Sequence, residues 1–305
     1  MDLGIFYTRL GVIILVVALG FFLGKKRILN NKVNLVFVNL LLSVLMPASL
    51  FSAFPAEFDQ NTFFYFLRGF TSGVIVLTSV IIISKLVFTP RVIKGEFRYS
   101  AQFAFIFNNA TFLGYPLISS TFGADGMMAY LGFIIVFNLA LFSYGVWLFE
   151  RKVNLKLFFR TITNPNILAV IIGALIFIFS LPAPEFITAS IGSIAGATTP
   201  LALICVGFML SQADLKKVFK KRKLFITAAL QLTLGPLATY LVLTAFGFTG
   251  IERTVCVILQ ALPTATSLAL FAKKYGSDDR EASELVAIST LISVITLPIV
   301  VALIF

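Results

Sequence analysis

The 305-residue chain is 59% hydrophobic and only 12% charged, with 34 phenylalanines and a net charge of +11. Soluble domains carry about 25% charged residues, so the composition excludes an ordinary soluble domain and indicates a membrane protein. There is no histidine, and both cysteines, Cys205 and Cys256, lie inside apolar stretches. Neither a zinc site nor a disulfide framework is therefore expected, and no cofactor is predicted.

Ten apolar segments are predicted to cross the membrane as helices. A bilayer core of about 30 Å requires roughly 20 apolar residues per spanning helix. The first and third segments are short and reach this length only if flanking basic side chains extend toward the head groups. In chain order, the predicted spans are residues 10–24, 33–56, 69–84, 99–124, 126–149, 161–184, 186–213, 224–251, 254–272 and 285–305.

The basic residues are distributed unevenly between the two sides of such a chain. All of the 24 except Arg9, Arg68 and Arg253 fall in loops on one side. Positively charged loops face the cytoplasm, so both termini are expected outside it, in the inner or plasma membrane of the cell. The positive charge is therefore explained by topology, and no nucleic-acid partner is expected.

The two halves of the chain resemble each other at a constant offset of 153 residues. Each half, 1–150 and 151–305, contains five predicted spans, so the second half would enter the membrane from the opposite side. This predicts an all-α membrane fold of two inverted five-helix repeats, which is typical of secondary transporters. The identical pairs are Pro47 and Pro200, Gly20 and Gly173, Thr111 and Thr264, Gly123 and Gly276, and Asp125 and Asp278.

The fourth and ninth spans carry polar residues and helix breakers near the middle. Proline removes a backbone donor and clashes with the preceding turn, so both helices are expected to break there. The half-helix N-termini would favour an anion, with amides and hydroxyls completing the site. Ordinary kinks, with the amides bonded to neighbouring helices, are the alternative interpretation. The candidate substrate-binding residues are Asn108, Asn109, Thr111, Gly114, Pro116, Pro263, Thr264, Thr266 and Ser267.

All acidic residues fall in loops or at the ends of spans. A buried carboxylate proton relay is therefore not expected. Sodium stays open as a coupling ion, because Thr264, Thr266 or Ser267 could coordinate it together with unwound carbonyls. The same hydroxyls could instead bond back to their own helix. An uncoupled carrier needs no such residue, since a monoanion gains about 2.3 kcal/mol on leaving a negative-inside cell at 100 mV.

Several motifs, in order along nearly the whole chain, resemble the auxin efflux carrier family in its compact bacterial form. The short segment from Glu150 that joins the halves differs from the long loop of the plant auxin exporters, which disfavours auxin itself as substrate. The matching motifs are MPASLF (46–51), NATFLGYPL (109–117), NPNILAVIIG (164–173), TPLALICVG (199–207), ALPTATSLALFAKKYG (261–276) and TLISVITLP (290–298).

The resemblance implies a division of labour among the ten spans. Spans 1, 2, 6 and 7 would form a scaffold and the surface of a homodimer, and spans 3–5 and 8–10 a moving transport unit. A small organic anion would bind where spans four and nine cross and would be carried by an elevator-type movement. Asn109, Pro116 and Pro263 would belong to this crossover, and Asn138 in the fifth span would face it.

Three functions stay open from the sequence. The first is an organic-anion carrier, and the second is a sodium-coupled symporter resembling the bile-acid/sodium symporters, which have a similar inverted-repeat architecture. The third is a membrane sensor or scaffold. A sensor is expected to carry an added soluble domain, and 305 residues leave no room for one. An enzyme is not expected, because the intramembrane serines and threonines have no His, Lys or Asp at the same depth.

Overall fold

A computed structural model describes residues 3–93, 95–151, 163–213 and 221–304. This part of the chain is helical and contains no β-strand, only an isolated bridge between Asn108 and Thr264. The α-helices (α) and π-helical turns (η) are α1 (Leu3–Lys25), α2 (Asn31–Leu40), η1 (Leu41–Leu45), α3 (Met46–Ser52), α4 (Gln60–Val87), α5 (Phe97–Ile106), η2 (Ala110–Gly114), α6 (Tyr115–Thr121), α7 (Gly123–Ala140), η3 (Leu141–Gly145), α8 (Val146–Glu150), α10 (Pro165–Ile178), α11 (Glu185–Gly196), α12 (Thr198–Ser211), α14 (Arg222–Ala245), α15 (Ile251–Gln260), α16 (Ser267–Lys274) and α17 (Asp279–Ile304).

Seven helices in the described ranges are long and apolar enough to cross a membrane. The all-helical membrane class predicted from the sequence is thereby confirmed. α10 is apolar but shorter, and the predicted fourth and ninth spans are each divided into two shorter helices. The seven long helices are Gly4–Lys25, Asn31–Ser52, Gln60–Val87, Gly123–Glu150, Glu185–Ser211, Arg222–Ala245 and Asp279–Ile304.

Polar side chains cap several helices at their loop ends. Asn30 accepts hydrogen bonds from the N–H groups of Lys32 and Val33, both at 3.0 Å, at the start of α2. Asp59 begins α4 by accepting from the hydroxyl and the N–H of Thr62 at 2.6 and 2.7 Å. These two hydrogen bonds hold the pKa of Asp59 below its usual value, and the bond from the hydroxyl has the larger effect. Such caps satisfy N–H groups that a helix cannot pair internally, so they determine the residue at which each helix begins.

Two prolines inside apolar helices follow π-helical turns. Pro47 follows η1, and Pro116 follows η2. At the end of η2 the N–H of Tyr115 bonds to the carbonyl of Ala110, five residues back. The wider turn accommodates a residue without an N–H, so the helix continues past it. The prediction that the fourth span breaks at its proline is therefore wrong, because the break lies earlier, at residues 107–109.

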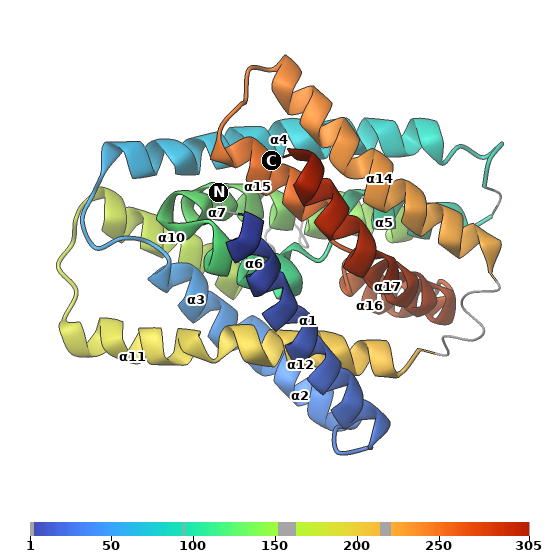
Figure 1. The fold of residues 1–305 in the computed structure, drawn as a ribbon, viewed down its shortest axis with the longest axis horizontal. Helices are drawn as coiled ribbons and strands as arrows, with labels where there is room; N and C mark the ends of the chain where they lie inside the picture. The colour runs from blue at the N-terminus through green and yellow to red at the C-terminus, as the bar shows by residue number, and fades with distance from the viewer. Residues whose placement is uncertain (1–2, 94, 152–162, 214–220, 305) are drawn as a thin grey trace.

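Close helix pairs organise the molecule, with α4 packed along α7 and α1 along α12. A Cβ at Gly69 would lie 2.0 Å from the carbonyl oxygen of Ala129, and one at Gly132 would lie 2.1 Å from that of Phe66. Glycine thus lets the α4 and α7 backbones approach each other, as is common between helices in membranes. Figure 1 shows α4 crossing the upper part of the molecule and α11 and α12 crossing the lower part.

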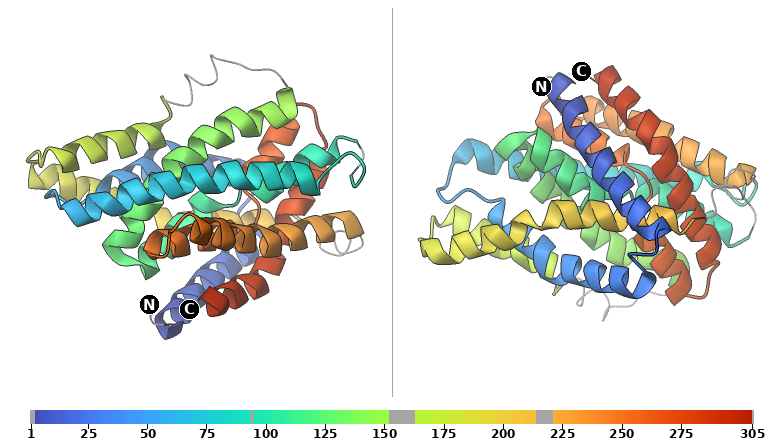
Figure 2. Two further views of the ribbon diagram at one scale, coloured as in Figure 1. Left: turned by 90° about the horizontal axis from the view of Figure 1, so that it is seen from above. Right: turned by 60° about the horizontal axis from the view of Figure 1, so that its bottom comes forward.

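The first and last helices lie beside each other. Both views in Figure 2 place the N- and C-terminal ends of the ribbon together. The hydroxyl of Tyr7 in α1 donates to the carbonyl oxygen of Pro298 in α17 at 3.4 Å. The described ends of the chain are therefore on the same side of the molecule.

We expect Gly20→Ala to destabilise the protein by about 1–3 kcal/mol. A Cβ at Gly20 would lie 2.3 Å from the carbonyl oxygen of Ile204, so α1 would have to move away from α12. Gly11→Ala in the same helix is the matched control, because a Cβ there has nothing within 4 Å. It should be neutral or slightly stabilising. Thermal unfolding in detergent measures both variants, and equal melting temperatures would contradict the close contact.

Candidate functional site

The chain leaves the helical conformation after α5 and after α15, and the two extended stretches meet as a short antiparallel bridge. Asn108 and Thr264 face each other across it. The N–H groups of Asn109 and Ala265 each donate to a carbonyl oxygen of the opposite stretch, at 2.7 and 2.9 Å. Backbone groups exposed by a helix break need partners inside a membrane protein. Here each broken helix supplies partners for the other.

Two glutamines hold this bridge from α14 and α15. Gln260 accepts from Nδ2 of Asn108 at 3.0 Å and donates to the α5 backbone at 2.8 Å. Gln231 accepts from the hydroxyl of Thr264 at 3.1 Å and donates to the carbonyl of Leu262 at 2.7 Å. Both glutamine side chains are fully buried. The sequence-based site did not include them, although each is a lone amide in an otherwise apolar stretch, which is the signal that could have found them.

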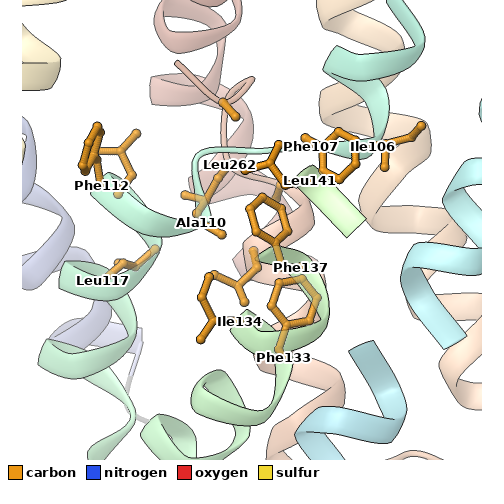
Figure 3. Packing of buried hydrophobic residues seen from close by; sticks show 14 of the residues in the cluster. Ile106, Phe107, Ala110, Phe112, Leu117, Phe133, Ile134, Phe137, Leu141 and Leu262 are labelled. Atoms are coloured by element: carbon orange, nitrogen blue, oxygen red, sulfur yellow. The ribbon is translucent and has the colours of Figure 1, made fainter. Parts of the chain in front are cut away.

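Aromatic side chains pack beside the bridge on the α7 side. The ring centroids of Phe107 and Phe137 lie 5.8 Å apart, and Phe137 stacks on Phe133 at the same separation (Figure 3). The hydroxyl of Tyr130 donates to the carbonyl oxygen of Ala110 at 3.1 Å. All of these side chains are buried, so α7 forms a closely packed wall behind the bridge.

A cavity of about 490 Å³ lies between α2 and α12 on one side and α16 and α17 on the other. It extends from Thr266, next to the bridge, to Arg280 at the start of α17. A smaller apolar cavity of about 80 Å³ shares Val206 and Thr290 with it and reaches Pro263. The polar residues lining the larger cavity are Asn31, Asn34, Gln212, Thr266, Arg280, Ser283, Glu284 and Thr290.

The predicted site residues of the ninth span lie at the bridge and along the cavities. Pro263 lines the smaller cavity and Thr266 the larger one. Thr264 is fully buried within the bridge, where its N–H donates to the hydroxyl of Ser289 at 3.1 Å. Ser267 begins α16, and its buried hydroxyl has no hydrogen-bond partner among the described residues. The start of α16 is thus the half-helix N-terminus that adjoins the larger cavity.

The predicted residues of the fourth span mainly stabilise the bridge. Asn108 is 1% exposed, and its Oδ1 has no partner in the described part of the chain. The side chain of Asn109 accepts from the N–H of Phe112 at 3.2 Å and so caps η2. Buried polar groups are normally paired, so the free Oδ1 of Asn108 gives the bridge unused capacity for a ligand or water.

The other predicted residues lie farther along the chain. Thr111 is part of η2, and Gly114 and Pro116 are buried at the transition from η2 to α6. Asn138 donates to the carbonyl oxygen of Ile134 in its own helix at 2.9 Å. Its amide is therefore engaged locally, and no hydrogen bond joins it to the bridge residues that the structure describes.

Two acidic residues in the described part of the chain are buried, which their positions near span ends did not indicate. Glu252, in the first turn of α15, is 1% exposed and lies 2.7 Å from the guanidinium of Arg68 in α4. Glu284, in α17, pairs with Lys221 and lines the larger cavity. Both remain near helix ends, as expected, but their burial depends on cations from distant segments. No group of three or more His, Cys, Asp or Glu residues in the described ranges could hold a metal ion.

A multi-pass helical membrane protein with broken helices meeting beside a cavity has the architecture of proteins that move solutes. The chain belongs to the membrane transport protein family, whose model matches residues 5–157 and 149–301. This confirms the resemblance to auxin efflux carriers inferred from the motifs.

Three relatives in this family illustrate the similarity. The chain is 25% identical over 193 residues to an "Uncharacterized transporter" of Methanothermobacter thermautotrophicus, covering 63% of each chain. It is 31% identical over 138 residues to a "Putative malonate transporter" of Rhizobium meliloti, covering 45% of this chain and 42% of the relative. It is 21% identical over 296 residues to an "Uncharacterized transporter" of Methanocaldococcus jannaschii, covering 94% of both. The matches to the first two thus cover less than two thirds of those relatives' length, and the family and relatives are transporters rather than enzymes.

Proposed function

We propose that the protein is a secondary carrier for small organic anions, chiefly carboxylates. The observation that carries the proposal is the position of the bridge, formed by the stretches after α5 and α15, beside a cavity that extends to Arg280. The substrate would bind where Thr266 and Ser267 begin α16, since a helix N-terminus favours an anion. Asn108, Asn109 and Thr264 would hold the backbone of this site in place. The name of the malonate transporter relative supports a carboxylate as the substrate class.

The proposed architecture has ten spans in two inverted repeats, residues 1–150 and 151–305. α10 and the two broken helices α5–α6 and α15–α16 would join the seven long helices. The two halves share a glycine with a positive φ at the same offset, +62° at Gly123 and +76° at Gly276. They also share a packing pattern. At the same offset α1 corresponds to α10 and α3 to α12, and α1 packs on α12 as α10 packs on α3.

An elevator movement would carry the bridge past a scaffold. In this proposal α1–α3 and α10–α12 form the scaffold, and α4–α8 and α14–α17 form the transport unit. The larger cavity supports this division because its walls come from both units, α2 and α12 on one side and α16 and α17 on the other. A cavity between two units that slide would open to one side of the membrane at a time.

The scaffold would also form a homodimer in the inner or plasma membrane, with both chain termini outside the cytoplasm. α11 has no buried residue, and a Cβ added at Gly192 or Gly196 would meet nothing within 4 Å. Two glycines at this spacing let helices associate closely in a bilayer. The exposed face of α11 therefore supports association with a second copy.

Thermal stabilisation of the purified protein tests the proposed function. Acetate, lactate, malonate and succinate would each be added as sodium and as N-methylglucamine salts, with chloride as the control. A ligand at 100 times its Kd should add about 2.7 kcal/mol to the free energy of unfolding. Stabilisation by a carboxylate in both salts, followed by its uptake into liposomes, is the expected result. A sodium requirement would favour the symporter, and no effect of any carboxylate would contradict the carrier.

A further inference from the structure

Charged side chains gather at the end of the larger cavity that is farther from the bridge. They come from the start of α14 and the first turns of α17. Glu284 contacts two cations: it pairs with Lys221, and its Oε1 lies 3.6 Å from Nε of Arg280. Beside this group, Lys223 and Glu281 form a separate pair at 2.5 Å. The Lys223–Glu281 pair has one charge of each sign. In the group around Glu284, by contrast, Lys221 and Arg280 share a single carboxylate.

The group around Glu284 is open to the cavity. Arg280 and Glu284 both line it, and Lys221 adjoins it only through its pair with Glu284, whereas Lys223 and Glu281 are not among its lining residues. The side chain of Glu284 is only 7% exposed, while those of Arg280 and Lys221 are 71% and 38% exposed. The carboxylate is therefore held inward, and the two cations reach toward solvent. Among the described residues of this group, the two cations exceed the one carboxylate by one charge, which a second carboxylate would balance.

The facing wall of the cavity offers a further polar group. Asn34 in α2 lines the cavity and is 8% exposed, and its Oδ1 has no hydrogen-bond partner among the described residues. A buried amide oxygen normally has a partner, so an unpaired one in a cavity wall points to a bound water or ligand. The cavity thus combines unbalanced positive charge at Arg280 with unused hydrogen-bonding capacity on the facing wall.

We propose that Lys221 and Arg280 form a carboxylate-binding site at this end of the cavity, and that Glu284 occupies it when no ligand is bound. The inference rests on the proposed carrier function and adds a site separate from the bridge. An arriving carboxylate would displace Glu284 from one of its cations on the way to the bridge. In the empty protein Glu284 neutralises most of the positive charge, which lowers the cost of moving these cations through an apolar environment.

The test measures the apparent Kd for malonate by thermal-shift titration of the full chain, with N-methylglucamine salts at constant ionic strength. Glu284→Gln removes the competing carboxylate and keeps the side-chain size, so the Kd should fall about tenfold, equivalent to one charge-assisted hydrogen bond. Arg280→Gln should raise the Kd by a similar factor. Glu281→Gln is the matched control, because Glu281 of α17 is also paired with a lysine, Lys223 of α14, but does not line the cavity. The Kd of this variant should differ from that of wild type by less than about twofold.

The outcomes separate this inference from the proposed function. If wild type binds malonate and Glu284→Gln leaves the Kd unchanged or raises it, Glu284 does not compete with the ligand. The inference then fails, and the carrier proposal stands. If wild type shows no binding but Glu284→Gln does, the inference is supported. If neither binds any of the four carboxylates, both proposals fail. Should Glu284→Gln not fold, an unchanged Kd in Arg280→Gln, whose side chain is largely exposed, would overturn the inference.

Discussion

Gln260→Leu should release the bridge between Asn108 and Thr264. Leucine has a similar volume but neither accepts from Nδ2 of Asn108 nor donates to the α5 backbone. Each buried group left without a partner costs about 1–3 kcal/mol, so the loss of both bonds should lower the free energy of unfolding by about 2–5 kcal/mol. Hydrogen exchange should accelerate at the N–H groups of Asn109 and Ala265, and carboxylate uptake should fall at least about tenfold.

Gln102→Leu provides the matched control for this change. Gln102 in α5 is also a buried glutamine, but it donates to the carbonyl oxygen of Phe88, at the end of α4, at 3.3 Å. It makes no hydrogen bond to the described bridge residues. It should lower stability by about 1 kcal/mol without altering exchange at the bridge or uptake. Unchanged exchange at Asn109 and Ala265 in folded Gln260→Leu would show that the bridge does not depend on this side chain.

Arg68→Met should destabilise the protein by about 3–5 kcal/mol, the usual result of removing one partner from a buried ion pair. The guanidinium of Arg68 lies 2.7 Å from Glu252 and over the rings of Phe64 and Phe248, 5.3 and 4.8 Å from their centroids. Methionine retains much of the apolar contact but leaves the carboxylate of Glu252 buried without its cation. Thermal or denaturant unfolding at neutral pH measures the loss.

Two further variants test the cause of that loss. Arg68→Met combined with Glu252→Gln should recover most of the stability, because no buried charge is then left unpaired. Arg151→Met should change it by only about 0–1 kcal/mol, since the pair of Arg151 with Glu96 at 3.0 Å has side chains 51% and 72% exposed. Equal effects of Arg68→Met and Arg151→Met would indicate that burial does not make the Arg68 pair important.

The candidate site could be predicted only in part from the sequence. Two polar segments inside apolar spans indicated where the helices break, and the structure joins those segments through Asn108 and Thr264. The position of the first break was wrong, because a π turn lets the helix continue through Pro116. The role of Gln260 was missed because its bond to Asn108 joins residues 152 positions apart. Local patterns carry no information about such a pairing.

The amino-acid sequence by itself determined that this is a helical membrane protein of a transport family, because the lengths of the apolar segments and the order of the motifs do not depend on how the helices pack. It also predicted that the acidic residues lie in loops or at the ends of spans. Only the tertiary structure decided that Glu252 and Glu284 are buried against cations, and that the bridge adjoins a cavity that extends to Arg280 and Glu284. Burial and cavities depend on which helices become neighbours, and that choice follows from side-chain packing across the whole molecule.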